Sequence, residues 1–257
     1  MIKQLLKWFI FFPANYKSSK NHKYLVTKFW GNKIDSFTVN RGIFKGIILS
    51  KHGSYGSSFL PKVTGYYEHE LENEFKLILE DAFTNIVVIG AAEGYYAVGL
   101  AKKKPDSNVF AFDISKKALK LCLLNKVLND AKNLTISGVC SQTHLIKLCR
   151  NTKSLVICDI EGDEDALFSE IDPMVLQNTT LVIELHELAN MGVTDKLRSI
   201  FESTHHITSV FSEDDVYKQN KIQNLNGKSV TNEECYMLLR EKRQHIMQWF
   251  ICRPKLN

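Results

Sequence analysis

The 257-residue sequence predicts an α/β protein whose central sheet has seven mostly parallel strands with helices on both faces. The main observation is that, from residue 85 onward, short apolar runs alternate with amphipathic stretches, which is the pattern of βα units. The apolar runs are rich in Val, Ile, Leu or Phe, as strands covered on both faces should be. No internal repeat is visible.

Each predicted strand is one of these short apolar runs. The first five strands are expected at 85–90, 108–113, 133–140, 154–159 and 179–186. The last third of the chain supplies two more, separated by a long polar connection and a helix, at 206–212 and 247–254.

The predicted helices are amphipathic stretches around these strands, at 66–82, 94–104, 115–130, 194–205 and 231–243. Ser115 and Thr194 stand where helix N-caps are expected. The stretch at 52–65 is rich in Gly and Ser, which is typical of a loop. Its position before the first βα unit also suits a substrate lid.

Composition indicates one domain, which we expect at 66–257, preceded by a basic N-terminal extension at 1–65. With 44% hydrophobic residues the chain can bury a substantial core. Its six cysteines form no CxxC pair, so neither a zinc site nor a disulfide framework is indicated, and a reducing cytoplasm fits best. The early apolar run LLKWFIFF is too short to span a bilayer, and no small-residue cleavage site follows it, which argues against secretion.

Charge is unevenly distributed along the chain. Residues 1–51 hold ten Lys or Arg and one acid, and residues 240–257 hold five and one, so the segment between them is acidic. A basic start of this kind is suited to peripheral contact with an anionic membrane surface or to an acidic partner. The alternative, which we favour, is a helix whose apolar side chains pack on the domain.

The turn after the first predicted strand, GAAEG, is the most informative segment. Gly90 and Gly94 let the backbone approach a ligand, and the next helix would point its N-terminal N–H groups at that ligand. Asp113 ends the second strand about 20 residues later, where an acid commonly binds the ribose hydroxyls of a nucleoside. Together these features indicate a nucleoside cofactor.

Two such cofactors compete. A dinucleotide fingerprint opening at Gly90 would want glycine where this chain has Ala92 and Tyr95, whereas the spacing to Gly94 is that associated with S-adenosylmethionine. Tyr95 and its neighbour Tyr96 also suit a sulfonium, because tyrosine faces attract cations. Packing beneath the sheet is the alternative for both tyrosines.

In this order, the segments GSYGSSFLPKVTGYYEHEL, IGAAEGYYAVGLA, VFAFDIS, ICDIEGDE and LVIELHE resemble an FkbM-type member of the class I S-adenosylmethionine-dependent methyltransferases. The resemblance covers roughly residues 53–205. It implies a Rossmann-like fold with the strand order 3-2-1-4-5-7-6 and strand 7 antiparallel. The family includes O-methyltransferases that act on sugar or polyketide hydroxyls.

The resemblance also implies the cofactor site. The loop under the methionine moiety would be formed by Gly90, Ala91, Ala92, Glu93 and Gly94. Asp113 would bind ribose, and the end of the third strand, at Val139 and Cys140, would face adenine. The chain departs from many class I enzymes at Val88, where an acid usually anchors the cofactor's amino group. Substitutes for that acid are Glu93, Glu68 and Glu70.

A second group of residues is expected at the ends of the fourth and fifth strands. Asp159 and Glu161 follow one strand, and Glu184 and His186 end its neighbour, about 4.8 Å away in a sheet. We expect the four to converge at the edge where an open α/β sheet binds its ligands. They offer a side-chain base for a hydroxyl acceptor, with His186 and Glu161 as candidates, or a site for magnesium or manganese.

Three further acids begin the next predicted helix, and the helix dipole explains them: Asp163, Glu164 and Asp165. The sequence thus predicts an S-adenosylmethionine-dependent O-methyltransferase that modifies a sugar or glycan-precursor hydroxyl. A non-catalytic binding or scaffold protein of the same fold is the first alternative, motivated by Val88, and a nicotinamide-dependent oxidoreductase is the second. Nucleic acid is a weaker substrate candidate, because DIEG replaces the Asn-Pro-Pro-aromatic sequence of enzymes that methylate DNA bases.

Overall fold

The computed structural model describes residues 20–32, 34–243 and 245–255. The first 19 residues, which hold the apolar and basic segment suggested for membrane contact, lie outside these residues. The described part of 20–65 shares one apolar core with the sheet, since Leu25 and Phe37 belong to the same buried cluster as Phe75 and Ile86. The domain boundary at residue 65 stays a prediction.

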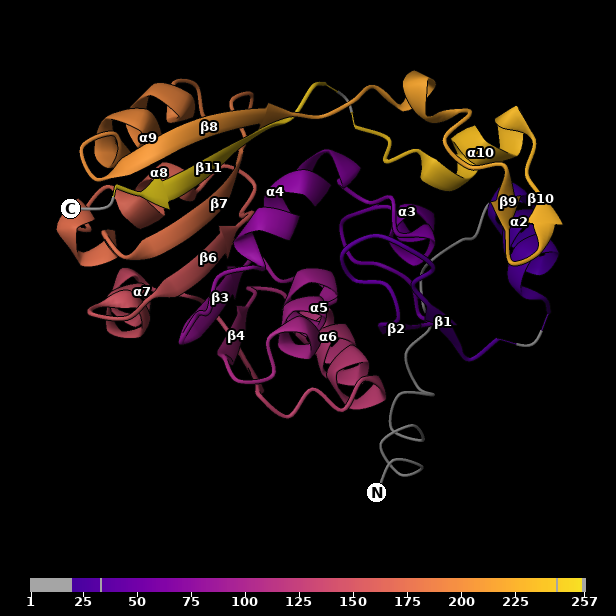
Figure 1. Ribbon diagram of the computed structural model, residues 1–257, viewed down its shortest axis with the longest axis horizontal. Coiled ribbons are helices and arrows are strands. Elements are labelled where there is room, and N and C mark those ends of the chain that lie inside the picture. Colours follow the sequence, from indigo (N-terminus) through magenta and orange to yellow (C-terminus); the bar gives the residue numbers. More distant parts are fainter. Residues whose placement is uncertain (1–19, 33, 244, 256–257) are drawn as a thin grey trace.

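The centre of the molecule is a seven-stranded sheet in the order β5-β4-β3-β6-β7-β11-β8 (Figure 1). Within this sheet, strands β3 to β7 pair in parallel, and β11 runs antiparallel to both of its neighbours, β7 and β8. This confirms the predicted fold class and strand order. The bounds are β3 Asn85–Ile89, β4 Asn108–Phe112, β5 Leu134–Ser137, β6 Ser154–Cys158, β7 Thr179–Leu185, β8 His205–Phe211 and β11 Gln248–Pro254.

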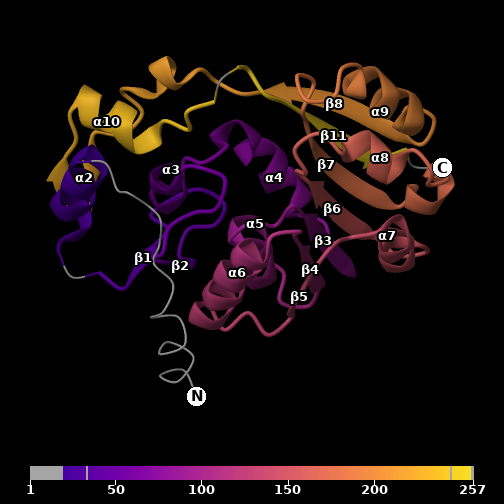
Figure 2. The same ribbon diagram turned by 180° about the vertical axis from the view of Figure 1, so that it is seen from behind.

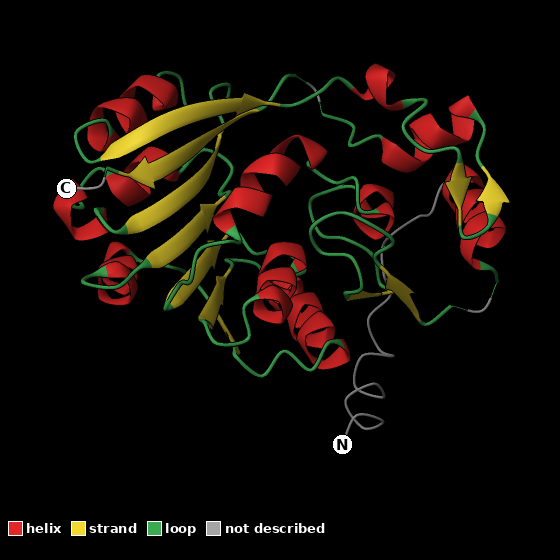
Figure 3. Ribbon diagram, in the orientation of Figure 1, coloured by secondary structure: helices red, strands yellow, loops and turns green. Residues whose placement is uncertain are grey.

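Helices cover both faces of this sheet (Figures 2 and 3). Because side chains alternate along a strand, Val88 faces one apolar cluster and Val87 the other. The first cluster is covered by α4 (Glu72–Ile78), α5 (Tyr95–Lys103) and α6 (Lys116–Leu128). The second is covered by α7 (Gln142–Cys149), α8 (Glu164–Phe168) and α9 (Val193–Phe201).

Two helix starts differ from the prediction. The helix expected from residue 66 begins as a 3-10 turn, η1 (His69–Leu71), because Glu68 before it adopts a left-handed φ of 48°. The helix expected from Thr194 has Gly192 as its N-cap, with a φ of 80°. The Thr194 hydroxyl instead donates a hydrogen bond to Glu187 at 2.7 Å.

An accessory layer brings the first described helix together with a helix from the last third of the chain, on the side of the molecule opposite β8 and α9 (Figures 1 and 2). Helix α10 (Asn232–Leu239) packs on α2 (Lys20–Trp30) and on α3 (Phe59–Thr64), and Lys28 of α2 pairs with Glu234 of α10 at 2.6 Å. Helix α3 lies within the stretch predicted as a loop. The remaining elements are β1 (Ser36–Thr38), β2 (Ile48–Ser50), η2 (Pro173–Leu176), η3 (Asp215–Lys218), β9 (Asn224–Leu225) and β10 (Lys228–Ser229).

The topology also locates the functional edge. From β3 the chain winds outward through β4 and β5, and it then returns to the opposite side of β3 as β6. Open α/β sheets bind ligands at such a switch point, outside the carboxyl ends of the strands. The segments that follow β3, β4, β6 and β7 therefore define the candidate site.

Candidate functional site

A cavity of about 910 Å³ lies at this edge, between the sheet and the segments of the accessory layer. Its volume falls within the range of small-molecule and cofactor sites. Residues from all four strand ends line it, among them Gly90, Asp113, Asp159 and Glu184.

The glycine turn forms one wall of the cavity. Gly90 has a φ of 79°, and a Cβ placed on it would lie 1.6 Å from the Asp159 carbonyl oxygen, so no larger residue fits. The N–H groups of Gly90 and Ala91 both donate to the Phe112 carbonyl at 2.9 Å. This close approach of β3, β4 and β6 opens the space that a bound cofactor would need.

Asp113 connects this turn to the following βα unit. Its carboxylate accepts the N–H of Ala92 at 2.8 Å and that of Ser115 at 2.7 Å. A carboxylate offers about four acceptor positions, so two remain for ligand hydroxyls. Beside it, Cys140, Ile114 and Val139 line the cavity, and Ile114 is 84% and Val139 64% exposed, which is the apolar surface that a purine would cover.

The structure does not place Glu93 or Gly94 on the cavity lining. The Glu93 side chain is 1% exposed and accepts hydrogen bonds from Lys62 at 2.5 Å and from Ser54 at 2.7 Å. Its carboxylate also accepts the N–H of Tyr55 at 3.0 Å and so fixes the 52–65 stretch to the glycine turn. Glu93 therefore does not face the cavity, and its suggested replacement of the acid missing at Val88 stays a prediction.

The two tyrosines after the turn have different roles. Tyr95 lines the cavity and contacts Tyr67 edge to face, with ring centroids 5.6 Å apart. Tyr96 also lines the cavity, but its ring stacks on Phe75 at 5.3 Å and its hydroxyl donates a hydrogen bond to Glu68. Tyr67, which also lines the cavity, was not singled out from the sequence.

The predicted acid and histidine group does converge. One ligand atom from each of Asp159, Glu184 and His186 lies within 4.8 Å of the other two. His186 Nε2 is 3.5 Å from Asp159 Oδ1 and 3.5 Å from Glu161 Oε2. Glu161 stands at the rim with 83% of its side chain exposed, and its φ of 57° is left-handed. Two oxygens and an imidazole are donors that magnesium or manganese accepts.

Glu164 belongs to this group, although the sequence assigned it to the helix dipole with Asp163 and Asp165. Its carboxylate is fully buried and lies 2.6 Å from His186 Nδ1. Asp163 does occupy the N-cap position of α8, and Asp165 pairs with Lys196 at the surface at 2.8 Å. The three acids follow one another in the sequence, and nothing in their spacing shows which of them turns inward.

Arg243 is the main cation beside these acids, and it was not predicted as a site residue from the sequence. It lies 2.7 Å from Glu184, 3.0 Å from Glu68 and 3.2 Å from Glu241. No motif marks it, because it comes from an irregular segment between α10 and β11.

One guanidinium does not balance all of these acids. Burial and the charge of Glu68 raise the pKa of Asp159 to about 7. Burial and Asp159 raise the pKa of Glu184 to about 7, and burial and Glu184 raise that of Glu68 to about 7. Burial opposes the charging of His186, but Glu164 and the other nearby acids outweigh it and raise the pKa of His186 to about 9.

Backbone strain is concentrated at the same cavity. Seven described non-glycine residues have a left-handed φ, and four of them line it: Glu68, Ala92, Glu161 and Lys242. Such conformations cost about 1–3 kcal/mol each and gather at functional sites. Their position supports a binding role for the cavity independently of its charges.

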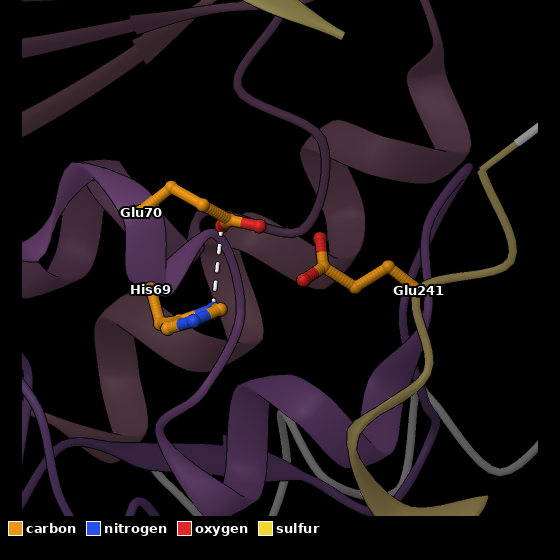
Figure 4. A group of neighbouring side chains, drawn as sticks. All are labelled: His69, Glu70 and Glu241. Carbon is orange, nitrogen blue, oxygen red and sulfur yellow. Dashed lines mark ion pairs between the residues drawn. The ribbon is translucent and has the colours of Figure 1, made fainter. Parts of the chain in front are cut away.

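A second group of candidate metal ligands lies behind the cavity wall. Figure 4 shows His69 and Glu70 facing Glu241, and their ligand atoms also lie within 4.8 Å of one another. The buried ammonium of Lys218 lies 2.6 Å from Glu241 and 3.8 Å from Glu70. A protein cation already serves these acids, so we assign no metal to them. Glu70 pairs within this group and does not line the cavity, whereas Glu68 does. Which residue substitutes for the acid missing at Val88 stays a prediction.

Within the described residues, no helix combines the length and the apolar character needed to cross a membrane.

No family model matches the chain, and no curated protein matches it. The FkbM-type resemblance therefore stays a prediction. Some solved structures are similar to this chain at low identity. One is a precorrin-6y C5,15-methyltransferase from Geobacter metallireducens, with 11% identity, a TM-score of 0.46 and coverage of 72% of this chain and 88% of that one.

Two other solved structures illustrate the range. The O-methyltransferase TomG from Streptomyces achromogenes, solved in complex with S-adenosylmethionine, has 13% identity and a TM-score of 0.45, over 74% of this chain and 81% of its own. An rRNA methylase from Streptococcus thermophilus has 11% identity and a TM-score of 0.46, over 72% of this chain and 97% of its own.

Proposed function

We propose that this protein is an S-adenosylmethionine-dependent O-methyltransferase that acts on a hydroxyl of a sugar or glycan precursor. One observation carries the proposal. The strained glycine turn, the Asp113 carboxylate and the Asp159–His186 pair all open into one cavity at the switch point of the sheet. A nucleoside site and a group that can accept a proton therefore lie side by side.

The residues present fit the cofactor. Asp113 would accept the ribose hydroxyls, and Cys140 and Val139 would cover the adenine ring. Glu68 would face its positively charged α-ammonium group, because Glu68 is an acid on the same cavity that Arg243 does not fully balance. The bound cofactor supplies a methyl group on a sulfonium, which is a strong leaving group.

The acid and histidine group would serve the acceptor. The acceptor oxygen attacks the methyl carbon while the carbon–sulfur bond breaks and leaves its electron pair on sulfur. The hydroxyl proton would go to a side-chain base, for which His186 is the candidate inside the cavity and Glu161 the one at its rim. Because nearby acids raise the pKa of His186 to about 9, His186 would take this role in its neutral form, once the positive charge of the bound cofactor offsets those acids. In a metal-dependent variant of the proposal, Asp159, Glu184 and His186 would hold magnesium or manganese and lower the pKa of the hydroxyl.

A second candidate function is a non-catalytic binding or scaffold protein, which Val88 favours because it removes one usual anchor of the cofactor. Such a protein would fail to bind the cofactor or would bind it without turnover. An oxidoreductase is less well supported, since Ala92 and Tyr95 replace two glycines of a dinucleotide fingerprint. We also keep a small-molecule or glycan acceptor and a cytoplasmic location as proposals, the latter because all six cysteines are free and buried.

Calorimetry with S-adenosylmethionine and S-adenosylhomocysteine tests the proposal. Asp113→Ala removes charge-assisted hydrogen bonds worth roughly 1.5–3 kcal/mol, so affinity should fall by about one to two decades. Asp113→Asn keeps an oxygen acceptor, so its affinity for the cofactor should lie between those of wild type and Asp113→Ala. Equal affinity in wild type and Asp113→Ala, or tighter binding of NAD than of S-adenosylhomocysteine, would refute the nucleoside assignment.

A further inference from the structure

His186 is held in one orientation at the end of β7. Its side chain is 11% exposed, with Nδ1 turned toward the interior and Nε2 toward the cavity. On the interior side Nδ1 lies 2.6 Å from Glu164 Oε1. On the cavity side Nε2 lies 3.5 Å from Asp159 and 3.5 Å from Glu161, which is too far for a strong hydrogen bond.

Glu164 is itself fixed before it meets the histidine. Its side chain is 0% exposed, and Oε1 also accepts the N–H of Gly162 at 3.1 Å. The loop that carries it is tight, because a Cβ on Gly162 would lie 2.9 Å from the Ala189 Cβ. Asn190 donates to the Gly162 carbonyl at 3.0 Å. This loop therefore presents one carboxylate oxygen to His186 in a set direction.

We propose that Glu164 is a positioning residue for His186, fixing the imidazole so that Nδ1 keeps its proton and Nε2 faces the cavity. The inference rests on the proposed function for what Nε2 then does. Whether Nε2 accepts the acceptor's proton or binds a metal ion, its lone pair must face the cavity. In both cases the partner of the other ring nitrogen sets the tautomer and the ring orientation.

The neighbouring acids at the start of α8 do not share the buried position of Glu164 or its contact with His186. Asp165 lies one residue further along, and its carboxylate pairs with the exposed Lys196. Asp163 is exposed at the N-cap position. A carboxylate that only complemented the helix dipole would be as effective in either of these positions and would not need burial. Glu164, by contrast, is fully buried, and its second oxygen, Oε2, has no hydrogen-bond partner among the described residues.

The test compares Glu164→Gln with the matched control Asp165→Asn. In wild type, the short charge-assisted bond should give a far-downfield proton resonance coupled to ¹⁵N, assigned to His186 by its absence in His186→Asn. Glu164→Gln should lose this resonance or shift it strongly upfield, while Asp165→Asn keeps it. Glu164→Asp, which keeps the charge but withdraws the carboxylate, should retain it in weakened form and serves if Glu164→Gln does not fold.

Turnover gives a second, independent readout. On whichever sugar wild type methylates in a panel of monosaccharides and nucleotide sugars, Glu164→Gln should lower kcat by about 10–100-fold and leave the S-adenosylmethionine Kd within about twofold. An unchanged resonance together with an unchanged kcat in Glu164→Gln would overturn the inference. If wild type neither binds S-adenosylmethionine nor transfers methyl groups, the proposed function fails, and the resonance alone still decides the role of Glu164.

Discussion

Two clusters of carboxylates lie beside each other in this structure, on either side of Arg243. They differ in how their negative charge is balanced. The site cluster consists of Asp159, Glu184, Glu68 and His186 on the cavity. The rear cluster consists of His69, Glu70, Glu241 and Lys218 behind it (Figure 4). Arg243 connects them, because it pairs with Glu184 and Glu68 on one side and with Glu241 on the other.

Proton affinity separates the two clusters. Burial would raise the pKa of Glu70, but hydrogen bonding with His69 and the charge of Lys218 outweigh it and lower that pKa to about 2. Its contribution to stability is therefore present above about pH 4.5 and is lost as the pH falls toward 2. The acids of the site cluster behave in the opposite way, because their pKa values lie near 7. They oppose folding progressively as the pH rises from about 4 to above 7.

The comparison shows what a balanced and an unbalanced cluster are each suited to do. A cluster that contains its own cation holds segments together, and here Lys218 joins η3 to the segments that carry Glu70 and Glu241. A cluster short of cations loses stability but can accept a positively charged partner from outside. The sulfonium and amino groups of the proposed cofactor, or a metal ion, are such partners.

The largest effect is expected from removing the cation of the rear cluster. Lys218→Met leaves the carboxylates of Glu70 and Glu241 buried without their ammonium, which should lower the free energy of unfolding by about 3–5 kcal/mol. Lys196→Met is the control, since Lys196 pairs with Asp165 at the surface and should cost less than about 1 kcal/mol. Urea unfolding of both variants at neutral pH measures the difference. Equal stability of the two variants would mean that the rear cluster is not held together by Lys218.

The site cluster should respond in activity instead. If it serves the acceptor, Asp159→Asn or His186→Ala should lower methyl transfer by about 100-fold or more, while S-adenosylmethionine affinity stays nearly the same. The measurement is a radiolabelled methyl-transfer assay alongside calorimetry.

Controls and chelation sharpen this prediction. Asp163→Asn and Asp165→Asn should change stability by roughly 0.3–1 kcal/mol through the helix dipole and leave transfer intact. Activity lost in EDTA and restored by magnesium or manganese would support the metal-dependent variant, whereas indifference to EDTA would leave a side-chain base. If Asp163 mattered as much as Asp159, the division between site and helix start would be wrong.

The fold was largely predictable because it depends on patterns that are local in the sequence. Apolar runs such as 85–90 and 154–159 are buried on both faces and read as strands without any knowledge of their partners. The errors lie where one distant contact decides the local structure. The stretch at 52–65 has the composition of a loop, yet Lys62 in it is 3% exposed and bound to Glu93, 31 residues away.

The candidate site was predictable where strand ends position it. Asp159, Glu184 and His186 follow neighbouring parallel strands, so their convergence follows from topology. Arg243 was not predictable, because an irregular segment delivers it to the cavity. Glu164 was obscured by its neighbours, since a residue at a helix start can face solvent or the core and only the packing of the loop decides.

The smallest expected effect is a gain in melting temperature in the site cluster that is present at high pH and disappears at low pH. Asparagine at 159 cannot ionise, so the variant avoids the loss of stability that wild type suffers as the pH rises through the raised pKa of Asp159, about 7. The Asp159 side chain is 38% exposed, so solvent reduces the effect to about 1 kcal/mol, or roughly 2–4 °C in Tm. Without cofactor and in EDTA, Asp159→Asn should therefore melt higher than wild type at pH 8 and at the same temperature near pH 4. Asp163→Asn should melt slightly lower than wild type at pH 8. An Asp159→Asn protein less stable than wild type at pH 8 would show that this carboxylate is paired for structure, as Glu70 is in the rear cluster.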